Sequence, residues 1–419
     1  MEVINDTCFT YLLLPFQLNP PKFSLTFVIK GTFALSPMDK VDVAPEQLFP
    51  SGDESHPEGS EGPGSCSYEA DSAYYKPRAD LTLAGKCHVP GGRPRAACRV
   101  VFQVGSHRKV LGVIGDRYWI SRSSQIKTTN PQTFTEMELR YENGFGGEGY
   151  KKNPIGKGYR PVTAEDGTKY WPLPNIEDPG SLIASPDDRP EPAGFGPLGR
   201  LWQHRISKMG SYGGSWFQER WPWFPADFDW GYFNAAPPDM QVEGYLRGDE
   251  ELYFENLHTE HSQYRSRLPG LRVRCFLNEL QQRDTQASYF HEVLMNLDTL
   301  WVDMEAEKLV LVWRGVTDVK SEAHDELQQF FIVDEPLEDV PKSIVHYRDV
   351  FTKRLAELEQ EWNPELEEPE PGGSKTEDTE SKDDSGVQEA TAQADESIRS
   401  ALVKAGIDPD NPVPPHREF

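Results

Sequence analysis

The sequence predicts a mainly β protein in which antiparallel sheets pack as a sandwich or an open barrel. Three observations lead to this fold class. Between Asp80 and Trp119, short apolar runs alternate with turn signals, which is typical of consecutive antiparallel strands. Residues 173–240 show neither a helical nor a strand period, so they form a long irregular segment rich in aromatic residues, proline and glycine. Residues 343–362 carry apolar side chains at helical spacing and predict a C-terminal helix.

Strands are expected in order before the irregular segment. Apolar residues alternate with polar ones from Lys22 to Leu35, which predicts a single strand. The next strands are joined by a tight turn at Gly91-Gly92, where glycine supplies the positive φ, and by a connection at Ser106-His107. A further strand is expected over Thr133–Tyr141.

Strands after the segment are expected over Glu251–Phe254, Leu271–Leu277 and Lys308–Val316, and the helix over 343–362 closes the folded part. We therefore expect one β-rich domain over residues 1–362. The pattern leaves open whether residues 10–142 and 250–342 share sheets or form two sub-sheets joined by residues 143–249.

Two stretches have too few apolar residues to fold. Residues 51–66 predict an exposed, mobile loop. Residues 363–419 form an acidic tail that we expect to be largely disordered, with a short helix over 398–405. A solvated linker is favoured over a tail that docks a partner.

The irregular segment carries many large aromatic side chains. Residues of this kind are too apolar to leave in water, so the segment is expected to be ordered and laid against the core. Long ordered loops serve both structure and catalysis. The sequence favours the structural role and leaves an active-site loop open.

Composition limits the partners and the compartment. The formal net charge of −25 argues against nucleic acid and anionic membranes as partners. The five cysteines show no CxxC spacing, which favours free thiols in a reducing compartment. The first residues have neither a basic region nor a long apolar run, so no signal peptide is expected. We expect a soluble, cytoplasmic protein.

No cofactor site is expected. His258 and His261 are too few for zinc, and HExxH spacing is absent. Gly156-Lys157 suggests a phosphate loop, but Gly149 is too far upstream and Gly158 replaces the required Ser or Thr. Neither a metal, a nucleotide nor another small-molecule ligand is therefore predicted.

Paired carboxylates offer weak candidates for acid–base chemistry. They are Asp187 and Asp188, followed by Arg189, and the pair Asp227 and Asp229. Aspartates beside proline and phenylalanine more often accept hydrogen bonds in turns and caps. No nucleophile motif accompanies them, so the chemistry alone does not indicate an enzyme.

Several long motifs are more informative when taken together. They are GGRP at 91–94, GDRYW at 115–119, NGFGG at 143–147, NPIGKG at 153–158, LPNIEDP at 173–179, LIASPDDRPEPAGFGPL at 182–198, WFPADFDWGYFNAAPPDMQ at 223–241 and GDE at 248–250. In this order they resemble the DUF2169 family over roughly residues 10–345. The stretch at 211–216, SYGGSW, departs from the family pattern, in which a Tyr-Asp pair often precedes the tryptophan.

The resemblance implies a structural role for the residues that define these motifs. They are Gly91, Gly92, Arg93, Asp116, Arg117, Trp119, Gly146, Gly147, Asn153, Pro154, Asn175, Ser185, Pro186, Arg189, Pro190, Gly194, Phe195, Gly196, Asp227, Asp229, Asn234 and Asp249.

The resemblance also implies a function. DUF2169 proteins are similar to adaptors, also called chaperones, of the type VI secretion system. Such adaptors hold a toxic effector in the cytoplasm, often one with a PAAR-type domain, and load it onto the VgrG spike. They are not known as enzymes, so no catalytic residue is expected.

An adaptor needs a surface for its partner, and tryptophan and tyrosine are favoured at binding hot spots. The candidate partner-binding residues are Trp202, Trp216, Trp221, Trp223, Trp230 and Phe233. Any of them could instead pin the segment to the core. Two alternatives remain: an enzyme of unknown reaction with its site in residues 143–240, and a structural component of the secretion apparatus.

Overall fold

The computed structural model describes residues 2–18, 22–56, 64–122, 125–280, 288–319 and 328–362. The chain divides into two units, Met1–Glu359 and Gln360–Phe419. The acidic tail with its expected helix, and residues 57–63 of the expected loop, lie outside the described residues.

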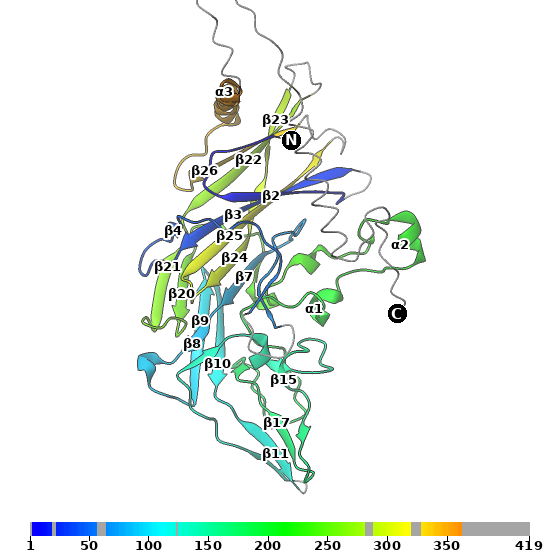
Figure 1. Ribbon diagram of the computed structural model, residues 1–419, viewed down its shortest axis with the longest axis vertical. Coiled ribbons are helices and arrows are strands. Elements are labelled where there is room, and N and C mark those ends of the chain that lie inside the picture. Colours follow the sequence, from blue (N-terminus) through cyan, green and yellow to red (C-terminus); the bar gives the residue numbers. More distant parts are fainter. Residues whose placement is uncertain are drawn as a thin grey trace, which may run out of the picture. The chain divides into compact units, whose positions relative to one another are not determined.

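The largest sheet, called the main sheet, has the strand order β19-β7-β24-β25-β3-β2, with β4 paired to β3 (Figure 1). Its pairs are antiparallel except for β7 and β24. The strands are β2 (Thr10–Phe16), β3 (Phe23–Ala34), β4 (Asp42–Val43), β7 (Ala79–Ala84), β19 (Gln241–Val242), β24 (Met295–Asp303) and β25 (Lys308–Val319).

Two further sheets complete the core. The second sheet has the order β1-β26-β22-β23 and the third sheet β18-β10-β9-β20-β21. Their strands are β1 (Glu2–Asn5), β9 (Ala97–Val104), β10 (His107–Ile114), β18 (Ile176–Glu177), β20 (Glu251–Glu255), β21 (Gln263–Arg267), β22 (Leu271–Leu280), β23 (Ser288–Val293) and β26 (Gln328–Pro336).

Shorter elements decorate these sheets. One small sheet contains β12 (Gln125–Thr128), β11 (Tyr118–Arg122), β17 (Lys169–Pro172) and β16 (Val162–Thr163). Two-stranded pairs are formed by β5 (Glu54–Ser55) with β6 (Cys66–Tyr68), β8 (Lys86–His88) with β13 (Glu136–Glu138), and β14 (Phe145–Gly146) with β15 (Lys157–Gly158). The helices are α1 (Gln203–Ile206), α2 (Gly214–Glu219) and α3 (Ile344–Trp362), with 3-10 turns η1 (Pro90–Gly92), η2 (Tyr141–Asn143), η3 (Trp230–Phe233) and η4 (Pro238–Met240).

One face of the main sheet packs against the second and third sheets to form the core. Phe27 and Leu311 of the main sheet share this core with Phe330 of the second and Phe102 of the third. The rings of Phe27 and Phe330 lie 5.0 Å apart. The mainly β prediction is confirmed, and the packing is that of a sandwich. No sheet closes into a barrel within the part of the chain that the structure describes.

Strands from both halves of the chain share sheets. β3 pairs with β25 and β7 with β24 in the main sheet, while β9 pairs with β20 in the third. Residues 10–142 and 250–342 therefore do not form separate sub-sheets. The irregular segment between them is an insertion into one β framework.

Most strand predictions are confirmed, and one is largely wrong. The runs beginning at Lys22, Glu251, Leu271 and Lys308 fall on β3, β20, β22 and β25. Over Thr133–Tyr141 only the three residues of β13 form a strand. Tyr141 instead starts a 3-10 turn and is buried, because its ring is taken into the irregular segment.

The predicted C-terminal helix is confirmed as α3. It covers the outer face of the second sheet, where Tyr347 and Phe351 pack among Phe276, Phe290 and Phe331. Helical spacing aligns these two side chains on one face. None of the helices in the described ranges is long and apolar enough to cross a membrane.

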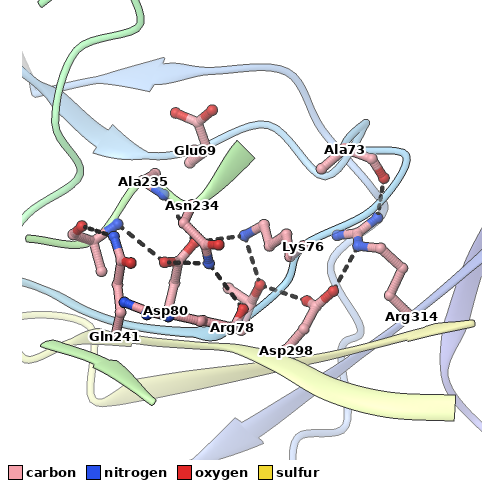
Figure 2. Close-up of polar contacts among 12 residues, drawn as sticks. Glu69, Ala73, Lys76, Arg78, Asp80, Asn234, Ala235, Gln241, Asp298 and Arg314 are labelled. Atoms are coloured by element: carbon pink, nitrogen blue, oxygen red, sulfur yellow. Dashed lines mark hydrogen bonds and ion pairs between the residues drawn. The ribbon is translucent and has the colours of Figure 1, made fainter. Parts of the chain in front are cut away.

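The second face of the main sheet carries buried ion pairs. Lys30 Nζ lies 3.0 Å from Asp71, Arg314 Nε 2.7 Å from Asp298, and Lys76 Nζ 2.9 Å from Asp80, all with side chains no more than 3% exposed. Arg314 also donates to the backbone carbonyl of Asp71 and, as Figure 2 shows, to that of Ala73. The stretch of chain from Asp71 to Lys76 is thus held against the sheet by charge-assisted hydrogen bonds.

Replacing Arg314 with methionine removes one partner and leaves Asp298 buried without its counter-charge. We expect a loss of about 3–5 kcal/mol in the free energy of unfolding, measured by urea denaturation. The matched control is Arg78→Met, which breaks an exposed pair with Glu243 and is expected to cost about 0–1 kcal/mol. Equal losses in the two variants would contradict the importance of the buried layer.

The docking of α3 is expected to depend on pH through Glu335. Burial opposes ionisation of this carboxyl, but hydrogen bonds from Arg272 and Tyr347 outweigh it and lower its pKa below the ordinary value of 4.5. Its contribution to stability is therefore complete above that value and is lost as the pH falls through the lower, folded-state pKa.

Glu335→Gln removes this titration. The difference in urea midpoint between wild type and the variant is expected to be largest near neutral pH and to shrink as the pH falls below about 4. A difference that stays constant across that range would contradict the role of the ionised carboxylate.

Candidate interaction site

The glycine-rich motif at 143–158 is built around one buried asparagine. Asn153 Nδ2 donates to the carbonyl oxygens of Tyr141 at 2.8 Å and Phe145 at 3.1 Å. The backbone of Gly146 passes so close that a Cβ there would lie 2.1 Å from the Asn153 carbonyl oxygen. The glycine is required by this close approach, and the loop is organised by its own side chain. Pro154 next to it is exposed.

Two other motifs bond directly to each other. Arg117 forms a buried ion pair with Glu177 and donates to the Pro174 carbonyl oxygen at 3.0 Å. Asn175 Nδ2 donates to Ile114 O at 2.8 Å and to Asp116 at 3.0 Å. The GDRYW and LPNIEDP motifs thus contact each other directly through these bonds. Trp119, also buried, pairs with Trp171 across β11 and β17.

Tyr141 forms a platform for the next motif. A Cβ at Gly194 would lie 2.7 Å from its ring, and its hydroxyl donates to the Gly196 carbonyl oxygen at 3.2 Å. Phe195 between these glycines is fully buried against Phe102 of β9, with ring centroids 5.7 Å apart. Trp202 packs edge-on against Tyr141 at 5.1 Å. The entry into the aromatic stretch is therefore fixed to the core.

The exit from that stretch is fixed by Asp80 of β7. Its carboxylate accepts hydrogen bonds from Asn234 Nδ2 at 3.0 Å and from the backbone N–H of Ala235 at 2.9 Å, and it also pairs with Lys76 (Figure 2). All these groups are buried. Asn234 of the WGYFNAAP sequence thus ties the segment to the ion-pair layer of the main sheet.

Arg205 of α1 links the chain that leads into the aromatic stretch to the chain that follows it. Its guanidinium binds Glu69 through two hydrogen bonds of 3.0 and 2.8 Å and donates to the carbonyl oxygens of Leu198 and Tyr232. The residue is 1% exposed. One side chain therefore holds residues before and after the loop that contains α2.

An aromatic cluster lies beneath that loop. Phe224 stacks on Phe228 at 4.2 Å and also contacts Phe16 at the end of β2. Trp230 lies 5.6 Å from Phe224, and Phe233 joins the same cluster. This packing buries Phe228 and Phe233 and partly covers Phe224 and Trp230 beside the end of β2.

Beyond the cluster, the loop ends in an exposed tip. We call Tyr212, Phe217 and Trp221, which are 45%, 66% and 61% exposed, the aromatic tip. The rings of Phe217 and Trp221 lie 6.2 Å apart. Trp216 beneath them donates its indole N–H to the Trp223 carbonyl oxygen at 2.7 Å. In Figure 1, α2 projects away from the sheets.

The structure divides the six candidate partner-binding residues. Trp202 and Phe233 are buried, so their surfaces are already used by the core. Trp216, Trp223 and Trp230 are partly covered, and Trp221 alone is well exposed. Sequence reasoning missed Phe217, although its spacing of four residues from Trp221 beside a short helix was an available signal.

The candidate acid–base residues are used in local turns. Asp188 accepts hydrogen bonds from the N–H groups of Ala184 and Ser185, both at 2.8 Å. Asp229 caps η3 by accepting from Gly231 N. Ser185 Oγ accepts from the Asp187 N–H, while Arg189 donates to the Pro186 carbonyl oxygen and Tyr150 to that of Pro190.

Asp227 is used in the same way at the base of the tip. It accepts from Ser211 N at 3.0 Å and from Ser211 Oγ at 2.8 Å, and these hydrogen bonds lower the pKa of its carboxyl. The turn geometry predicted for these aspartates agrees with these contacts. The GGRP motif likewise forms a turn, in which Gly91 and Gly92 have φ of 69° and 63° and Arg93 is exposed.

His258 and His261 are engaged with neighbouring groups. His258 Nε2 lies 2.6 Å from Glu307, and its Nδ1 accepts the N–H of Glu260 at 3.1 Å. Both ring nitrogens are therefore engaged. His261 stacks on the ring and donates its backbone N–H to the same Nδ1 at 3.2 Å.

Another group of possible metal ligands is Asp53, Cys66 and Glu69. Arg200 Nη2 lies 3.0 Å from Asp53 and 2.9 Å from Glu69, so a guanidinium already balances the carboxylates. Burial raises the pKa of the Cys66 thiol to about 12. The carboxylate oxygens of this group are thus already engaged by arginine in the structure.

Fold and site together define a mainly β protein in which motif residues build a buried frame beneath an exposed aromatic tip. The chain belongs to the DUF2169 family, described as uncharacterized proteins conserved in bacteria, whose model matches residues 22–314. No curated protein and no solved structure matches the chain.

The frame and the tip are expected to respond differently to the same substitution. Trp202→Ala removes a buried ring from the Tyr141 platform and is expected to cost about 3–5 kcal/mol in the free energy of unfolding. Trp221→Ala removes an exposed ring and is expected to stay within about 0.5 kcal/mol of wild type. Thermal and urea unfolding measure both. Comparable destabilisation by Trp221→Ala would mean that the tip is part of the packed structure.

Proposed function

We propose that this protein is a type VI secretion adaptor. It holds a toxic effector, one with a PAAR-type domain, in the cytoplasm and promotes its loading onto the VgrG spike. The observation that carries the proposal is the aromatic tip, which stands exposed on a buried frame made of DUF2169 motifs.

The side chains of the aromatic tip are of the kind that favours binding to another protein. Tryptophan, tyrosine and phenylalanine supply large contact areas and lose little conformational entropy on binding. Arg205 and Asp80 fix both ends of the loop, so the rings are presented from an ordered base. Preorganisation of this kind leaves more of the contact energy available for affinity.

The two alternatives have less support. An enzyme working in residues 143–240 would need reactive carboxylates, yet Asp188, Asp227 and Asp229 accept hydrogen bonds from neighbouring residues in turns and caps. A structural component of the secretion apparatus would form a stable assembly even without effector. The exposed tip fits a partner that is bound and released.

The test is a pulldown of the tagged full-length protein from its host while the secretion genes are expressed, read by mass spectrometry. Wild type is expected to recover a toxin with a PAAR-type domain, together with VgrG. The Phe217→Ser/Trp221→Ser variant is expected to lose this toxin and to keep the wild-type melting temperature.

The matched control is Phe49→Ser, which changes another exposed ring, 78% accessible, outside the irregular segment. It is expected to recover the toxin as wild type does. Wild-type recovery of no PAAR-type protein would overturn the adaptor proposal. Unchanged toxin recovery by the tip variant would place the binding surface elsewhere and overturn the role of the tip.

A further inference from the structure

A groove runs from the outward face of the third sheet to the start of β22 in the second sheet. Its first part is a hollow of about 290 Å³ lined by residues of β9, β10, β20 and β21. It shares Glu251, Leu252 and Arg265 with a second hollow of about 430 Å³. The second shares Lys40 and Arg267 with a third of about 530 Å³. We call these three connected hollows the basic groove.

The strand register explains why charged side chains gather there. Arg108 of β10 lies opposite Gln103 of β9, Gln103 opposite Tyr253 of β20, and Tyr253 opposite Arg265 of β21. These four residues form one row across four strands. The residues that alternate with them, such as Phe102, Phe254 and Tyr264, face the core. The row therefore faces solvent.

The groove reverses the charge of the chain. Seven basic side chains line it: Lys40, Arg99, Arg108, Arg247, Arg265, Arg267 and Arg272. Five acidic residues line it as well, whereas acidic residues outnumber basic ones 68 to 43 in the whole sequence. A local basic surface on a chain with a net charge of −25 is not a consequence of composition.

Some of these charges are balanced within the groove. Arg99 binds Glu255 through hydrogen bonds of 2.9 and 3.3 Å, and Arg247 and Arg267 share Asp249 of the family motif. These pairs hold the side chains in place and leave little charge for a ligand.

Three cations are not balanced. Within the described residues, no carboxylate lies at ion-pair distance from Lys40, Arg108 or Arg265. Arg265 instead lies over the ring of Tyr253, 4.8 Å from its centroid, and Arg108 lies in the same row. The stacked guanidinium keeps its edge free for an anion, because stacking uses only its face.

The lining also suggests the kind of anion. Guanidinium groups bind carboxylates through paired hydrogen bonds. Met38, 80% exposed, lines the middle hollow and offers an adaptable apolar contact between the charged parts. A ligand with carboxylates on both sides of an apolar side chain would match this order.

A nucleic acid fits the charges of the basic groove less well than an acidic peptide does. Its phosphates are closely spaced, so they would meet Glu251, Glu255 and Asp249 inside the groove as well as the field of a strongly acidic chain. A short acidic peptide can place its carboxylates at the arginines and leave the acidic positions uncovered.

We propose that the basic groove binds an extended acidic segment of a partner protein, with carboxylates at Arg108 and Arg265 in the first hollow and at Lys40, which lines the second and third. This site is independent of the secretion role proposed above. β20 and β21 lie on the other side of the sheets from α2 (Figure 1), so the groove and the aromatic tip can be occupied at the same time.

The test uses the full-length protein and a fluorescein-labelled, glutamate-rich peptide with a central leucine, read by fluorescence anisotropy. Wild type is expected to bind it, and binding is expected to weaken as salt is added. Arg108→Glu/Arg265→Glu is expected to weaken binding by at least about tenfold. The matched control is Arg160→Glu/Lys169→Glu, which makes the same change in net charge on residues outside the groove lining and is expected to bind as wild type does.

Each other outcome overturns the proposal. Equally weakened peptide binding in both variants, with melting temperatures unchanged, would show that binding depends only on the overall charge of the protein. A single-stranded oligonucleotide that binds more tightly than the peptide and depends on Arg108 and Arg265 would indicate a nucleic-acid site. An absence of peptide binding to wild type up to about 1 mM would also reject the acidic-segment site.

Discussion

The structure depends on the buried ion pairs that lie on the second face of the main sheet. A sheet with one apolar and one polar face normally turns the polar face to water. Here Lys30, Arg314 and Asp80 are on that face, and each is buried beneath chain that returns from elsewhere in the sequence. Because an unpaired buried charge is very unfavourable, each of these residues selects one arrangement of the covering chain.

Asp80 shows how this layer is connected to the surface. The same carboxylate binds a lysine of the covering stretch and the backbone that follows the aromatic cluster. Sheet, covering chain and irregular segment therefore meet at one group. Residues 198–236 have little regular secondary structure, and the buried side chains of Arg205 and Asp80 bond to their backbone near both ends of the segment.

The alternation of apolar and polar residues, as in the run from Lys22 to Leu35, predicts the fold class. The helical spacing of apolar residues predicts α3. The sequence does not predict that Lys30 and Arg314 are buried, since a charged residue at an alternating position predicts a solvent-facing side chain. Tyr141 was missed for a related reason. Its strand propensity is overridden by a tertiary contact with glycines fifty residues away, which no local pattern shows.

The sequence predicts which segment contains the candidate interaction site but not which of its residues are exposed. Tryptophan content marked the segment, but the number of rings that face outward depends on which of them meet Phe16, Tyr74 and Tyr141. The row Arg108–Gln103–Tyr253–Arg265 could not be found at all, because it is assembled by strand pairing between distant parts of the chain.

The separation of frame from tip has a consequence for how such a chain can change. Gly146 and Gly194 tolerate no side chain, since a Cβ would collide with the atoms they approach. Around Gly213 and Gly214 a Cβ would meet nothing within 4 Å. The stretch at 211–216 contains both glycines and lies in this open region. Substitutions near the aromatic tip can therefore accumulate while the buried frame stays constant.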